Sequence, residues 1–156
     1  MIISRSSWER LVELWDISEI ANTISKALAS LYMIKIGLRE PEVDVKILLH
    51  NIEKCRSILG KLLIDLDLYI SSKAPETALV TLLINAYGDT NVKKIREHLN
   101  RAIHGLEKLI KVLAYEPLDI SVFKDRDVIE LENLLRKLSD TLSRRVEQMA
   151  SEIYAF

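Results

Sequence analysis

Three histidines and a single cysteine are the first residues of this sequence to test for chemistry. Metal-binding helical bundles use inward carboxylates and Glu-x-x-His pairs, but no acidic residue stands three positions before His50, His98 or His104. Neither an HExxH motif nor a pair of cysteines occurs in the sequence. A metal site could form only from residues of different helices, and we expect neither a metal site nor a cofactor.

Catalytic motifs are also missing. The sequence holds no GxSxG nucleophile motif, no P-loop and no GxGxxG loop. Asp65 and Asp67 are two residues apart, which directs them to different sides of a helix rather than into a catalytic pair. The lone Cys55 stands among apolar positions, so we expect a buried, inert side chain. No residue is assigned a catalytic role.

An enzyme or small-molecule binder with a site between helices is nevertheless the alternative interpretation. Such a site would be marked by polar side chains facing a pocket. The candidates are Tyr32, Tyr69, Tyr87, His50 and Asn85.

Positive charge is concentrated in residues 90–115. This segment carries six Lys or Arg and two Glu, a net charge of +4, and the whole chain has −1, so the remainder sums to −5. At 100° per residue, six cationic or imidazole side chains fall opposite the apolar side of the predicted helix. This set, the basic stripe, comprises Lys93, Lys94, Arg101, His104, Lys108 and Lys111.

A line of cations on a rigid helix can follow a nucleic-acid backbone, whereas the plainer interpretation is an ordinary solvated face. Aromatic residues that could stack on bases are scarce in this segment, so we expect non-specific backbone contact at most. A thinner line of similar residues follows the outside of the preceding helix, at Lys46, His50, Lys54 and Lys61.

Apolar residues recur every three or four positions through the chain, which predicts an all-α protein. A first helix is expected from the capping-box spacing at Ser6 to Gly37, either unbroken or interrupted near Asp16. Pro41 should lie in the first turn of a second helix, which ends at Ser71.

The other half of the chain predicts three more helices. A short, buried one starts at Pro75 and stops at Gly88, with Asp89 or Thr90 capping the next. The fourth ends at Glu116 and Pro117, and Asp125 can start the fifth.

The length and composition of the chain indicate its architecture. The chain has 156 residues, 49% hydrophobic and 29% charged, with only four Gly and three Pro, which suits one helical domain over residues 1–156. Long helices with short connections run antiparallel. We predict an up-down bundle of four long helices plus one short buried helix. The longest uncharged stretch, residues 77–88, is too short to span a bilayer, so no membrane contact is expected.

These features favour a non-enzymatic helical interaction module, such as a small subunit of a nucleoprotein assembly. We expect a protein partner or a homo-oligomer, and an RNA or DNA backbone as a further partner. Exposed aromatic residues near the chain ends, among them Trp8, Trp15, Tyr154 and Phe156, would favour self-association. The absence of a secretory signal and of disulfide potential favours the cytoplasm. The abundance of Lys, Arg and Glu resembles thermophile composition.

Overall fold

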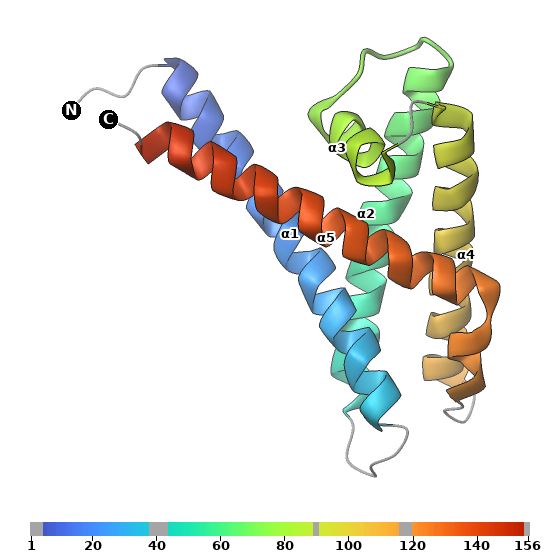
Figure 1. The fold of residues 1–156 in the computed structure, drawn as a ribbon. Coiled ribbons are helices and arrows are strands. Elements are labelled where there is room, and N and C mark those ends of the chain that lie inside the picture. The colour runs from blue at the N-terminus through green and yellow to red at the C-terminus, as the bar shows by residue number, and fades with distance from the viewer. Residues whose placement is uncertain (1–4, 38–43, 89–90, 116–119, 155–156) are drawn as a thin grey trace.

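The protein is described by a computed structural model covering residues 5–37, 44–88, 91–115 and 120–154, apart from the side chains of residues 5–8, 37, 120 and 154 (Figure 1). Within these ranges every regular element is helical. The elements are α1 (Arg5–Gly37), α2 (Val45–Ile70), α3 (Ala78–Tyr87), α4 (Val92–Tyr115), the short 3₁₀ helix η1 (Ile120–Lys124) and α5 (Arg126–Tyr154). The predicted all-α fold, with four long helices and a short one, is confirmed.

The first helix is unbroken. α1 continues through Asp16 for 33 residues, which decides between the two expectations in favour of one long helix. The predicted cap at Ser6 is wrong, because α1 already includes this residue. The predicted start of the second helix near Pro41 is also wrong, because α2 begins at Val45 after its N-cap Asp44. The predictions for Asp89, Thr90, Glu116 and Pro117 fall outside the described residues.

Local capping chemistry sets the other helix ends. Asp44 caps α2 by accepting a hydrogen bond from the amide of Lys46 at 3.1 Å, so the regular helix begins at Val45. α3 begins after Thr77 rather than at Pro75, because the Thr77 hydroxyl accepts from the amide of Val80. Gly88 ends α3 in the left-handed conformation, with φ of 62°, as expected.

The helices pack around α5, which contacts α1, α3 and α4, while α2 packs between α1 and α4. Figure 1 shows α5 running obliquely across the other long helices, so the simple up-down arrangement stays a prediction. α1 and α2 lie close together near residues 37 and 44 and spread apart toward α3 (Figure 1). No helix in the described part of the chain has the length and apolarity to cross a membrane.

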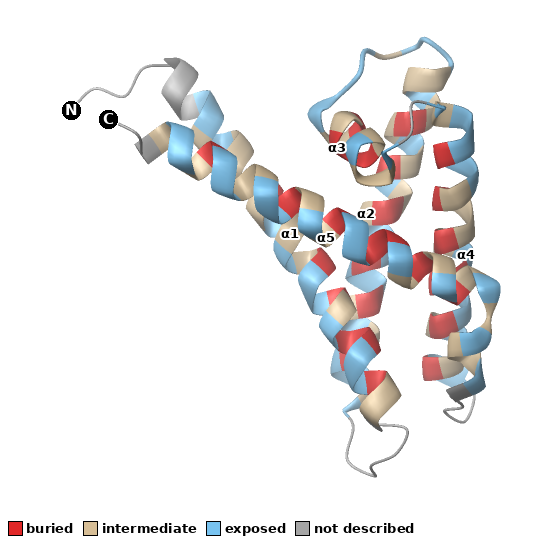
Figure 2. Ribbon diagram, viewed as in Figure 1, coloured by how far each residue is buried: buried red, intermediate tan, exposed pale blue. Residues whose placement is uncertain are grey.

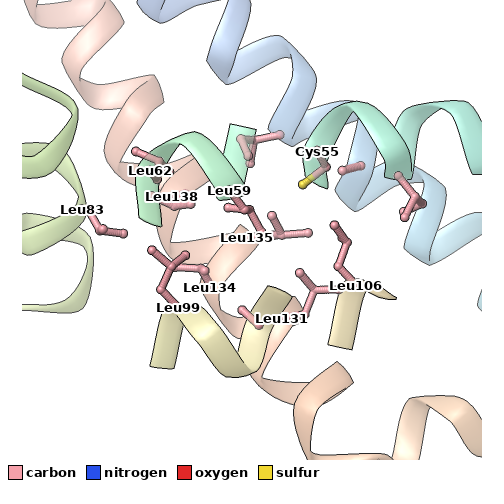
Figure 3. Close-up of a cluster of buried hydrophobic side chains, with 14 of the residues drawn as sticks. Cys55, Leu59, Leu62, Leu83, Leu99, Leu106, Leu131, Leu134, Leu135 and Leu138 are labelled. Carbon is pink, nitrogen blue, oxygen red and sulfur yellow. The ribbon is translucent and has the colours of Figure 1, made fainter. Parts of the chain in front are cut away.

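Aliphatic side chains fill the centre. Leu59 of α2, Leu106 of α4, and Leu131 and Leu135 of α5 are completely buried where these helices meet (Figure 3). Figure 2 shows buried residues on the sides of the helices that face one another. Cys55 is also completely buried, and burial raises the pKa of its thiol to about 12, so it behaves as a small apolar side chain.

A glycine allows two helices to approach each other closely in the core. Gly105 of α4 is buried, and a Cβ atom added there would lie 2.2 Å from the carbonyl oxygen of Asp127 in α5. That distance is far inside van der Waals contact, and the obstacle is backbone rather than a movable side chain. The start of α5 can therefore rest on α4 only while residue 105 lacks a side chain.

A matched pair of glycine substitutions tests this contact. Gly105→Ala should lower the free energy of unfolding by about 1–3 kcal/mol, because one helix must be pushed away from the other. Gly60→Ala, in α2, meets nothing within 4 Å and should raise it by up to about 1 kcal/mol through helix propensity. Urea denaturation of both variants measures the difference, and equal effects would contradict the proposed close approach.

Candidate functional site

The basic stripe lies on the side of α4 that faces away from the core. Lys93, Lys94, His104, Lys108 and Lys111 are exposed and Arg101 is half-buried. α2 and α5 cover the apolar sides of α4, so the cationic side chains remain together on the outward side. The fold thus brings the six predicted residues onto one surface.

Lys108 is held by two aspartates at the start of α5. Its Nζ lies 3.0 Å from a carboxylate oxygen of Asp125 and 2.9 Å from one of Asp127. Hydrogen bonds to Asp127 and Asp125 raise the pKa of Lys108, and the Lys108 ammonium lowers the pKa of Asp125. Asp125 also accepts from the amide of Asp127 at 2.9 Å, which makes it the N-cap of α5, as expected. Within the basic stripe, Lys108 is therefore already neutralised.

Ion pairs also form on the two flanks of α4. On the α2 side, Arg96 contacts Asp67 at 2.5 Å and Glu107 contacts Arg56 at 3.3 Å. On the α5 side, Nδ1 of His98 lies within hydrogen-bonding distance of a carboxylate oxygen of Glu130. By contrast, Lys93, Arg101 and His104 form no ion pair with any residue in the described ranges.

An aromatic side chain extends the same surface. Tyr115, in the last turn of α4, is 86% exposed, the largest value among the exposed large hydrophobic residues of the described chain. It follows His104 by eleven residues and Lys108 by seven, spacings that return to nearly the same direction on an α-helix. The sequence interpretation did not include Tyr115 in this surface. Its spacing from His104 and Lys108 could have indicated that it lies on the same side of the helix.

A second polar group lies where α3, α4 and α5 meet. The rings of Tyr87 and His98 are stacked with centroids 5.7 Å apart, and Nζ of Lys137 lies 5.4 Å from the Tyr87 ring centroid. The Tyr87 hydroxyl is buried and has no hydrogen-bond partner among the residues that the structure describes. Burial, and to a lesser extent the charge of Glu130, raise the pKa of Tyr87. This hydroxyl is available to a buried water molecule or to a ligand group.

The other residues of the alternative site do not join this cluster. Tyr32, His50 and Asn85 are exposed, and Tyr69 is half-buried at the end of α2. Of the five candidates, Tyr87 alone has a described contact with another polar or aromatic side chain of a neighbouring helix.

Comparison of the chain with family models, with curated proteins and with solved structures gave no match. Among the described residues, no group of three or more His, Cys, Asp or Glu side chains is arranged to hold a metal ion. The candidate sites therefore stand on the geometry above.

Replacing Tyr87 by Phe tests whether its hydroxyl is truly without a partner. Tyr87→Phe removes a buried, unsatisfied hydroxyl and keeps the stacked ring, so stability should rise by about 1 kcal/mol. Thermal and urea denaturation measure the change. A loss of about 1 kcal/mol or more would instead indicate a bound water molecule or ligand group at this position.

The Asp125 carboxylate gives stability a defined pH dependence. Because its pKa is lowered in the folded protein, its contribution is present above the ordinary value of about 3.9 and is lost as the pH falls through the lower folded pKa. Asp125→Asn retains an N-cap but removes the charge. Wild-type protein should be more stable than this variant at pH 7, and the difference should vanish in acid. A difference that is independent of pH would contradict the Lys108 pairing.

Proposed function

We propose that this protein is a non-enzymatic helical interaction module that contacts single-stranded nucleic acid along the outward side of α4. The observation that carries the proposal is the combination, on one exposed surface, of basic side chains that form no ion pair with the described residues and a highly exposed aromatic ring. Lys93, Arg101 and His104 supply the first, and Tyr115 supplies the second.

The spacing suits a backbone contact that extends over several nucleotides. Lys93 and Tyr115 are 22 residues apart in one helix, and at 1.5 Å per residue this is about 33 Å. Cations on such a rigid rod bind phosphates by replacing condensed counterions, which gives affinity without sequence preference.

An exposed tyrosine favours a single strand over a duplex. Bases in a single strand are accessible for stacking on an aromatic ring, which contributes about 1–3 kcal/mol per base. Tyr115 adds a non-electrostatic contribution at one end of the cationic surface. Sequence preference is not part of the proposal, because every base offers a face for stacking.

A role as a small subunit of a nucleoprotein assembly, in the cytoplasm, fits this activity. The net charge of the whole chain is −1, so a short cationic surface alone supports only weak binding. A protein partner or a second copy that adds further contacts would supply the remaining affinity.

Salt titration separates the two kinds of contact. Fluorescein-labelled 20-nucleotide oligouridylate and oligothymidylate are titrated with protein from 20 to 200 mM KCl and followed by fluorescence anisotropy. The plot of log K against the logarithm of the salt concentration has a negative slope. The double variant Lys93→Gln with Arg101→Gln should make this slope less steep by about 1.4, or 0.7 for each lost phosphate contact. Tyr115→Ala should weaken binding about 5- to 150-fold and leave the slope unchanged.

Two controls complete the titration. Arg10→Gln with Lys73→Gln removes one arginine and one lysine that are exposed on other helices or connections, and should change neither affinity nor slope. Binding that survives reversal of Lys94, Arg101, Lys108 and Lys111 to glutamate would reject the basic stripe as the site.

A further inference from the structure

A groove follows the seam between α1 and α2. Three hollows share lining residues in succession: one of about 520 Å³ shares Glu19 and Thr23 with one of about 220 Å³, which shares Lys26 and Asn51 with one of about 330 Å³. On α1 the lining runs from Glu13 to Met33, 20 residues or about 30 Å of helix. The seam is therefore hollowed along most of its length.

One end of the groove opens into an apolar pocket of about 160 Å³, which shares Ile20, Ile58, Lys61 and Leu79 with the hollow of about 520 Å³. Its wall comes from four helices and contains one polar residue, Lys61. The other lining residues are Ile20, Ile24, Ile58, Leu62, Leu79, Leu82, Leu138 and Leu142. A dry apolar cavity of roughly 150 Å³ can hold a benzene ring, so this pocket has the size of one large apolar side chain.

The rim at this end is acidic. Glu13, Asp16 and Glu19 of α1 line the wide hollow above the pocket, against the single cation Lys61, which gives the rim a formal charge of −2. None of these carboxylates forms an ion pair with the described residues. An apolar pocket beside carboxylates that form no ion pair within the described ranges is complementary to an apolar anchor flanked by positive charge.

The opposite end of the groove is apolar again. Met33 is 48% and Ile47 is 59% exposed, and both line the hollow there together with Ala29. Between the two ends the lining is polar, and the amide of Asn51 donates to the hydroxyl of Ser30 at 3.0 Å, which ties α1 to α2 beneath the groove. Ile20 and Met33 are 13 residues apart, or about 20 Å.

We infer that this groove binds an amphipathic helix of a protein partner. That helix presents one large apolar side chain to the pocket, with Lys or Arg beside it, and a second apolar group about 13 residues away over Met33 and Ile47. Helices commonly dock in grooves through such spaced apolar anchors. The pocket of about 160 Å³ is below the 300–1,000 Å³ that drug-sized ligands occupy, which favours a side chain over a cofactor. This surface is separate from the basic stripe on α4.

Two synthetic peptides of 20 residues test the inference. The first is a stapled helix of Ala and Gln with leucine clusters separated by 13 residues and three lysines around the first cluster. The second replaces those lysines by glutamate. Binding to the full chain, carrying ¹³C-labelled isoleucine methyl groups, is followed by NMR. The lysine peptide should shift the Ile20, Ile58 and Ile47 methyl signals and leave Ile129, an exposed residue of α5, unchanged. The glutamate peptide should bind at least tenfold more weakly.

Surface variants provide matched controls that preserve the core. A triple variant of the acidic rim should raise the Kd of the lysine peptide at least fivefold; it carries Glu13→Gln, Asp16→Asn and Glu19→Gln. The control triple variant on α5 should leave this Kd unchanged; it carries Asp140→Asn, Glu147→Gln and Glu152→Gln. Ile47→Ser should raise the Kd about threefold or more. Ile64→Ser, at a residue of α2 with nearly the same exposure, should not.

Several results would overturn the inference. Equal binding of the two peptides, or shifts centred on Ile129, would exclude a charge-selected helix in this groove. Concentration-dependent shifts of Ile20 and Ile58 without peptide, with a doubled mass by light scattering, would assign the groove to a second copy of the chain. The oligonucleotide titrations use a different surface, so either proposal can fail without the other.

Discussion

Val128 and five leucines along α5 are buried against α1, α3 and α4, and this packing decides which surfaces of the other helices stay open. α5 crosses the molecule obliquely, and α1 follows it, so α1 separates from α2 toward α3 (Figure 1). The apolar pocket at the head of the groove is lined by residues of α1, α2, α3 and α5. On the other side, α5 can approach α4 closely because residue 105 is glycine, and α2 covers the opposite flank. The cationic side of α4 is therefore the side that stays exposed.

Some charged side chains of α4 contact acidic residues of other helices, and others are exposed on the surface. Arg96, His98 and Lys108 contact acidic side chains of neighbouring helices, whereas Lys93, Arg101 and His104 form no ion pair with any residue that the structure describes. Exposed ion pairs contribute little stability individually, about 0–1 kcal/mol. These ion pairs instead help to orient the helices. Asp125 caps α5 and also pairs with Lys108, so the start of α5 is fixed to the side of α4. The local excess of positive charge seen in the sequence is thus smaller in the folded protein.

Much of the fold could be predicted from periodicity and capping residues alone. The five helices, the left-handed Gly88, the start of α5 at Asp125 and the buried Cys55 all depend on residues close in sequence. The site could be predicted only in part. The neutralisation of Lys108 depends on Asp125 and Asp127, which are 17 and 19 residues away and reach it only through the packing of α5 on α4. The Tyr87–His98–Glu130 cluster and the groove likewise join side chains of different helices, whose crossing angles a single sequence does not specify.

The walls of the apolar pocket belong to the hydrophobic core itself. Ile24, Leu62, Leu82 and Leu142 are buried residues that hold four helices together, and the same four side chains face the cavity. An apolar group seated there would complete the interior of the fold, so its binding energy would add directly to the resistance of the chain to unfolding and proteolysis. The side chains that would contact a bound apolar group are therefore the same side chains that stabilise the hydrophobic core. Evolutionary change in what the pocket accepts is therefore confined to substitutions that the interior also tolerates.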